Sequence, residues 1–194
     1  MSPAVLHATA RRFRAGFPGL VTFAVKANPA REVLENLVAA GIEAFDVASP
    51  AEMAAVREVL PSAVLHYNNP VRSTEEIALA LRFGVRSFSV DCAEELEKLV
   101  AAGVPEDSEI SVRLRLSVKG AAYDFGAKFG ADPAMAEALL RRVSEAGYQA
   151  SMTFHPGTQC DDPAAWTAYV EACAQASRAA GVPLARLNVG GGFP

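Results

Sequence analysis

The stretch Phe23-Ala24-Val25-Lys26-Ala27-Asn28-Pro29 decides how the rest of the chain is interpreted. The apolar run Leu20 to Val25 predicts a β-strand, and Asn28-Pro29 predicts the start of a helix. Lys26 then stands at the C-terminal end of a strand, where barrels and open α/β sheets place their chemistry. A lysine amine whose charged form is disfavoured in a poorly hydrated pocket attacks carbonyl compounds, which is Schiff-base chemistry. The alternative is a lysine that extends from the strand end into solvent.

Composition excludes several classes of protein. The chain has 194 residues, a net charge of -4 and 51% hydrophobic residues, which predicts one soluble, cytoplasmic domain with a substantial core. The sequence has no long basic stripe for nucleic acid and no apolar run of about 18 residues for a membrane span. Three widely spaced cysteines favour neither a disulfide framework nor a metal site. We expect Cys92 and Cys173 to be buried, and we assign no catalytic role to Cys160.

One β-then-α unit repeats seven times. The expected strands are residues 20–25, 43–47, 63–67, 85–90, 109–116, 148–154 and 184–189. Helices are expected at about 3–15, 29–40, 50–60, 74–84, 93–103, 133–147 and 163–181. Ser49-Pro50-Ala51-Glu52 forms a capping box, and Ser73, Asp91, Asp132 and Asp162 are expected to cap later helices. Residues 117–131 are too irregular to assign.

Strands that alternate with helices predict a parallel α/β sheet, either open and doubly wound or closed into a barrel. Polar residues or glycines at the strand ends are spread along all the units, which favours a barrel with one central mouth. They are Lys26, Asp46, Asn69, Arg115, His155 and Gly190. Because an eighth strand is needed for closure, we expect an incomplete (β/α)8 TIM barrel with about seven units.

Two segments near the C-terminus are candidates for anion binding. Gly190-Gly191-Gly192 follows an apolar strand, and glycines let backbone N–H groups approach a phosphate. The alternative is a flexible tail. His155 opens a Gly/Pro turn at the end of the sixth strand, and Thr158 in that turn would offer a hydroxyl to the same phosphate. The alternatives are a packed aromatic ring and an ordinary turn threonine.

Charged residues on two earlier strands are further candidates. Arg113 and Arg115 share a face of the fifth strand, and an arginine that points into a barrel needs an anionic partner. Arg113 alternatively lies at the lower end of the barrel. Asp46 ends the second strand, where it would orient Lys26 or bind a ligand, or serve only as a turn carboxylate. Glu52 is first a capping residue.

Taken together, these motifs resemble the fold-type III pyridoxal phosphate (PLP) decarboxylases of the ornithine and diaminopimelate group. The resemblance runs in order from about Leu20 onward and is closer to the ornithine branch. The motifs are Phe23-Ala24-Val25-Lys26-Ala27-Asn28, Phe45-Asp46-Val47-Ala48-Ser49 with Glu52, Asn69-Pro70, Leu114-Arg115-Leu116, Lys128-Phe129-Gly130, Phe154 to Cys160, and Gly190-Gly191-Gly192-Phe193-Pro194.

The resemblance implies a barrel of the alanine racemase-like type and PLP as cofactor. It also implies that Lys26 holds PLP as a Schiff base and helps to release product, and that His155 stacks on the pyridine ring. The implied cofactor-binding residues are Lys26, Asp46, Arg115, His155, Thr158, Gly190, Gly191 and Gly192, with no metal. The family places a small β-branched residue where this chain has Pro156, which would alter the turn.

The activity that the resemblance implies is decarboxylation of a basic, ornithine-like L-amino acid in polyamine biosynthesis, by a cytoplasmic homodimer. Residues 1–194 would be part of the N-terminal PLP-binding barrel domain, without the family's C-terminal β domain, whose segments supply further ligands. Two alternatives remain open: a diaminopimelate decarboxylase or racemase-like enzyme, and a catalytically inactive homologue that binds a protein partner.

Overall fold

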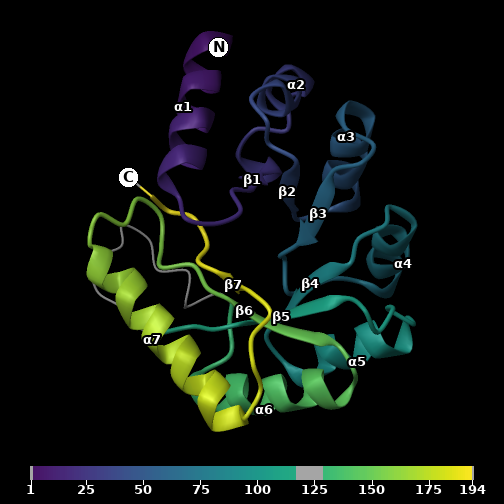
Figure 1. Cartoon of the computed structure of the whole chain (residues 1–194). Helices are drawn as coiled ribbons and strands as arrows, with labels where there is room; N and C mark the ends of the chain where they lie inside the picture. Colours follow the sequence, from purple (N-terminus) through teal and green to yellow (C-terminus); the bar gives the residue numbers. More distant parts are fainter. Residues whose placement is uncertain (1, 117–128, 194) are drawn as a thin grey trace. The chain divides into compact units, whose positions relative to one another are not determined.

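The computed structural model describes residues 2–116 and 129–193 (Figure 1). The chain divides into two compact units. Unit 1 comprises Met1–Asn69 and Glu75–Val85, and unit 2 comprises Pro70–Thr74 and Arg86–Pro194. Most of the segment that the sequence left unassigned, including Lys128, lies outside the described residues.

Unit 1 contains three short parallel strands and the helices that alternate with them. Its elements are α1 (Pro3–Gly16), β1 (Phe23–Ala24), the 3-10 turn η1 (Val25–Ala27), α2 (Arg31–Ala39), β2 (Ala44–Val47), α3 (Pro50–Val59), β3 (Val64–Tyr67) and α4 (Thr74–Arg82), whose first residue belongs to unit 2. β1 pairs with β2 and β2 with β3, so the strands follow chain order without reversal. Chain order is typical of a barrel, whereas a doubly wound sheet reverses at a switch point.

Helices α2 and α3 of unit 1 are built as their sequences predict. The apolar face of α2 is buried at Val33, Leu34 and Leu37, and α2 packs beside both α1 and α3 (Figure 1). The capping box of α3 is confirmed, because the Ser49 hydroxyl accepts a hydrogen bond from the Glu52 N–H. The Glu52 carboxylate accepts another from the Ala48 N–H, at 2.8 Å. Glu52 therefore has the structural role that its sequence position indicates.

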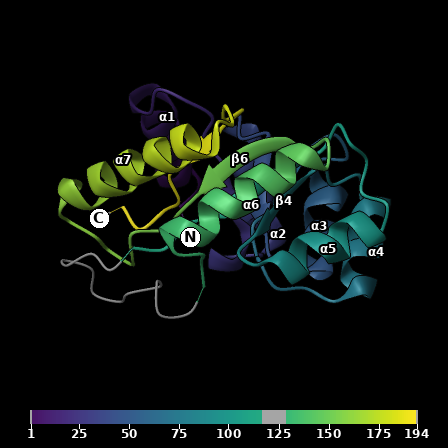
Figure 2. The same ribbon diagram turned by 90° about the horizontal axis from the view of Figure 1, so that it is seen from below.

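Unit 2 carries four parallel strands, again in chain order. Its elements are β4 (Ser87–Val90), α5 (Ala93–Ala101), β5 (Glu109–Arg113), α6 (Pro133–Glu145), β6 (Gln149–Thr153), α7 (Pro163–Ala180) and β7 (Leu187–Asn188). β4 pairs with β5, β5 with β6 and β6 with β7. Helices α6 and α7 lie side by side (Figure 2). No helix among residues 2–116 and 129–193 is long and apolar enough to cross a membrane.

The caps of unit 2 follow the sequence in two cases and depart from it in a third. Asp132 and Asp162 cap α6 and α7 by accepting backbone N–H groups. The expectation that Asp91 caps α5 is wrong. Cys92 is the N-cap residue there, and Asp91 instead accepts a hydrogen bond from the Gly130 N–H at 2.9 Å. Asp91 is therefore engaged by a residue far along the chain.

The cysteines are buried to different degrees. Cys173 and Cys160 lie in the core, and burial raises the pKa of the Cys173 thiol to about 12. Cys92 is only half-buried, so the expectation that it is a core residue is wrong. Burial is the main reason that the pKa of its thiol is also raised.

The strands are shorter than the sequence predicts, most of all β1, β5 and β7. β1 stops at Ala24 because the chain turns into the 3-10 turn η1, and β5 stops at Arg113. Beyond β5 the backbone pairs with Ala131: the Arg115 N–H donates to the Ala131 carbonyl, and the Ala131 N–H to the Arg113 carbonyl. Arg113 is thus the last residue of its strand, so the idea that it lies at the lower end of a barrel is wrong.

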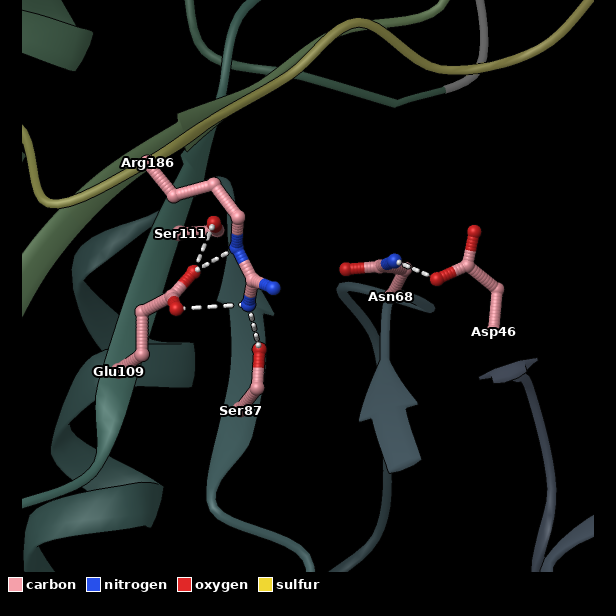
Figure 3. A network of polar contacts seen from close by, with 6 residues as sticks. All are labelled: Asp46, Asn68, Ser87, Glu109, Ser111 and Arg186. Carbon is pink, nitrogen blue, oxygen red and sulfur yellow. Dashed lines mark hydrogen bonds and ion pairs between the residues drawn. The ribbon is translucent and has the colours of Figure 1, made fainter. Parts of the chain in front are cut away.

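A polar network joins the N-terminal ends of three strands of unit 2 (Figure 3). Arg186 donates to both carboxylate oxygens of Glu109, at 3.0 and 2.6 Å, and also to the Ser87 hydroxyl at 3.1 Å. The Glu109 side chain is only 16% exposed. A bidentate arginine that also binds a third residue offsets the cost of burying the carboxylate.

We expect Arg186→Met to lower the free energy of unfolding by about 2–3 kcal/mol, because it leaves the Glu109 carboxylate without its guanidinium. Urea denaturation measures the change. The matched control is Arg31→Met, which breaks an ion pair with Glu35 that is exposed on both sides and should leave the unfolding curve unchanged. Equal curves for both variants would contradict a stabilising role of the network.

Candidate functional site

Lys26 lies immediately after the first strand of unit 1, in the 3-10 turn η1. The turn is closed by a hydrogen bond from the Asn28 N–H to the Val25 carbonyl, and the Asn28 side chain accepts from the Ala30 N–H. Val25 is fully buried, while the Lys26 side chain is exposed. Lys26 lies two residues after Ala24, the last residue of β1, so its expected position at the end of the strand is confirmed. The poorly hydrated pocket is not formed by the described residues, because the lysine faces solvent.

Asp46 lies on β2, in register with Ala24 of β1 and His66 of β3. Its two carboxylate oxygens accept hydrogen bonds from the Asn68 amide at 2.7 Å (Figure 3) and from the Thr22 hydroxyl at 3.1 Å. These neutral donors fix the orientation of the carboxylate. Asp46 is therefore more than a turn residue, since it joins side chains from three successive segments of unit 1.

In unit 2, His155 opens a turn that follows β6 closely. The imidazole is half-buried, and its Nδ1 accepts a hydrogen bond from the Gly157 N–H at 3.1 Å. A neutral imidazole with Nδ1 as acceptor carries its proton on Nε2. The turn therefore fixes both the orientation of the ring and the nitrogen that donates.

The Gly190–Gly192 segment packs against this turn. The Cys160 N–H donates to the Gly192 carbonyl at 2.8 Å, and the Gly190 N–H donates to the Asn188 side chain at 2.9 Å. A Cβ atom on Gly190 would overlap the Phe154 carbonyl, and one on Gly192 would overlap the Gly157 carbonyl. Both glycines have positive φ, +70° and +83°. Only glycine fits this close approach.

The segment also borders the imidazole and offers backbone donors. A Cβ atom on Gly191 would lie 3.7 Å from the His155 Nε2. Within residues 2–116 and 129–193, the N–H groups of Gly191 and Gly192 have no hydrogen-bond acceptor. Adjacent, unpaired N–H groups in a glycine loop suit an anion such as phosphate. The structure therefore brings His155 and all three glycines together, as the sequence predicts.

Thr158 and Gln159 form the exposed tip of the same turn. Gln159 has φ of +47°, and it alone among the described non-glycine residues has a positive φ. A glutamine is uncommon in this region of backbone space, which marks a constrained turn. Thr158 is next to that constraint and is itself exposed.

Of the two arginines on β5 and just after it, the structure partly buries Arg113 and exposes Arg115. The Arg113 guanidinium lies over the Phe129 ring, 5.4 Å from its centroid. Burial lowers the pKa of Arg113, while the nearby Asp91 carboxylate opposes that shift. The sequence pattern favoured Arg115 as the site residue. In the structure β5 ends at Arg113, and the Arg113 side chain is the more enclosed of the two.

Tyr169 is a buried residue that sequence reasoning missed. Its ring stacks on Phe154 with centroids 4.6 Å apart, and its hydroxyl donates to the Leu116 carbonyl and accepts from the Leu116 N–H. Tyr169 thereby connects Phe154, which precedes His155, to Leu116, which follows Arg115. Asn68 and Thr22 were missed as well. Asn68 follows the third strand directly, a position that could have identified it.

No group of three or more metal-binding side chains is formed within the described part of the chain.

Residues 4–194 match the family described as "Pyridoxal-dependent decarboxylase, pyridoxal binding domain". The lysine/ornithine decarboxylase of Selenomonas ruminantium is 36% identical over 182 residues, which are 90% of this chain and 45% of that protein. The ornithine decarboxylase of Panagrellus redivivus is 32% identical, over 89% of this chain and 40% of that protein. The chain thus belongs to the pyridoxal-dependent decarboxylases, and it spans less than half the length of these relatives.

A solved structure of a related enzyme has the same fold. The lysine/ornithine decarboxylase of Vibrio vulnificus, complexed with putrescine, matches with a TM-score of 0.85 and 28% identity, over 99% of this chain and 52% of that one. The likeness confirms the expected α/β fold, an incomplete (β/α)8 barrel with seven parallel strands among the described residues. In unit 2, taken by itself, the Gly191 and Gly192 N–H groups, which have no acceptor among the described residues, suit the phosphate of PLP, the family's cofactor. In unit 1, taken by itself, the exposed Lys26 offers an amine that suits its aldehyde.

We expect Gly192→Ala to destabilise the protein more than Gly181→Ala. Both glycines have positive φ, but a Cβ on Gly181 meets no atom within 4 Å, so that variant isolates the backbone cost of about 1–2 kcal/mol. Gly192→Ala adds a displacement of the turn at Gly157. Urea denaturation of both variants measures the difference. Equal losses would show that the loop is not confined by the turn.

Proposed function

We propose that this chain is the cofactor-binding part of a PLP-dependent decarboxylase that acts on a basic L-amino acid, with ornithine preferred. The observation that carries the proposal is the glycine loop beside His155, whose Gly191 and Gly192 N–H groups have no acceptor among the described residues. Family membership supports it, as do relatives named for lysine and ornithine.

We assign the covalent attachment of the cofactor to the Lys26 Nζ. The Lys26 side chain is exposed, two residues after the end of β1, in a turn whose first residue, Val25, is buried. When bound, PLP supplies the electron sink that makes loss of the substrate's α-carboxylate possible. The protein's part is to hold the cofactor and the breaking bond in a fixed orientation.

The remaining candidate residues would bind and orient the cofactor. The Gly190–Gly192 loop and the Thr158 hydroxyl would bind the phosphate. His155 would pack against the cofactor ring, with its orientation fixed by the Gly157 N–H. Asp46, held by two neutral donors, and Arg115 would contact the cofactor. Arg113 is included as a second candidate because of its more enclosed position.

We further infer a cytoplasmic homodimer in the route from basic amino acids to polyamines. The support is the likeness to decarboxylases that act on ornithine and lysine. Gel filtration with light scattering tests the dimer directly.

We expect PLP to attach to Lys26 in a form that borohydride makes permanent, so that peptide mass spectrometry finds the label on the Lys26 peptide. Lys26→Ala should abolish the label. Lys98 is the internal control, because its amine is engaged with Glu95 and with the Arg72 carbonyl, both at 2.6 Å. Labelling of Lys98 equal to that of Lys26 would mean non-specific reaction, and absence of Lys26 labelling would refute the assignment.

We expect the PLP-loaded protein to release CO2 from ornithine or lysine at least about 10-fold faster than from diaminopimelate, since substrate pockets discriminate by this order or more. Carbon dioxide release from each amino acid measures the preference, with Lys26→Ala as the inactive control. Preference for diaminopimelate would favour the other branch of the family. Attachment of PLP without turnover of any substrate would favour a catalytically inactive homologue.

A further inference from the structure

Trp166, the only tryptophan of the chain, contacts the residue that follows the glycine loop. Its indole on α7 stacks on the Phe193 ring, with centroids 5.2 Å apart and planes inclined by 11°. Phe193 comes directly after Gly192. The stack therefore ties the C-terminal side of the loop to a helix of eighteen residues in the same unit.

The loop needs such a support because glycines lose more conformational freedom on ordering than any other residue. Its N-terminal side is held by the pairing of β7 with β6 and by the Asn188 side chain. Its C-terminal side is held by the Cys160 N–H and by the Trp166–Phe193 stack. Gly191 and Gly192, whose N–H groups have no acceptor within the described residues, lie between these supports.

The stacking face of Trp166, rather than its N–H, makes this contact. The indole nitrogen is buried and has no hydrogen-bond partner among residues 2–116 and 129–193. Phenylalanine at this position would keep a ring for the stack and would remove the buried, unpaired N–H. The variants Trp166→Phe and Trp166→Ala therefore separate the ring contact from the rest of the side chain.

We propose that Trp166 is a positioning residue, which by stacking on Phe193 holds the Gly191 and Gly192 N–H groups in the conformation that binds phosphate. The inference rests on the proposed function for the identity of the ligand, PLP. It adds a residue on α7, outside the loop and the His155 turn, that acts on the phosphate and not on the rest of the cofactor.

The test compares the dissociation constants of PLP and of pyridoxal, which lacks the phosphate. Trp166→Ala should weaken PLP binding by about 3- to 10-fold, the equivalent of one aromatic contact, and pyridoxal binding by less than 2-fold. Phe193→Ala should reproduce the loss from the other ring. Trp166→Phe should restore the wild-type ratio of the two dissociation constants. Val170→Ala, a substitution at an exposed position of the same helix, should leave that ratio unchanged. Equal weakening of both ligands, or no weakening of PLP, overturns the proposal.

Amide hydrogen exchange of residues 187–193, without any ligand, tests the loop independently of PLP. Trp166→Ala should speed exchange in this segment several-fold, and Trp166→Phe should not. If the wild-type protein binds neither PLP nor pyridoxal, the proposed function fails. Faster exchange in Trp166→Ala would even then show that Trp166 holds the loop in place. Unchanged exchange in Trp166→Ala overturns the inference even where PLP binds.

Discussion

The hydrogen bond from the Cys160 N–H to the Gly192 carbonyl is the interaction on which the candidate site of unit 2 depends. It joins the turn after β6 to the loop after β7. Because parallel strands end at the same edge, β6 and β7 bring these loops together, but side chains would keep them apart. Glycine at positions 190 and 192 removes that obstacle, and the space gained lets backbone donors lie beside the His155 ring.

The sequence predicted what depends on local chemistry. Alternating strands and helices and the caps at Ser49, Asp132 and Asp162 follow from short patterns of residue type. These features need no knowledge of distant partners. Helix ends in particular are set within one turn, by a side-chain oxygen and the nearest free N–H groups.

The remaining features are set by contacts between distant segments. Asp91 fits a helix cap by pattern, yet the Gly130 N–H competes successfully for its carboxylate. Arg113 and Arg115 are indistinguishable by alternation, and the pairing with Ala131 determines where the strand ends. Trp166 stands in an ordinary helix, and nothing nearby in the sequence indicates its stack on Phe193. Pairings of this kind require the three-dimensional structure.

The Arg186–Glu109 network and the glycine loop lie at opposite ends of β7. Arg186 directly precedes β7, and Gly190 follows it. β7 is only two residues long and half-buried, but it pairs with β6, which is mostly buried, so a change of side chain at one end of β7 leaves the backbone at the other end in place. Thermal tolerance and ligand recognition can therefore evolve under separate selection. The first changes by exchange of polar residues at the N-terminal ends of the strands, and the second by exchange of the loops at their C-terminal ends.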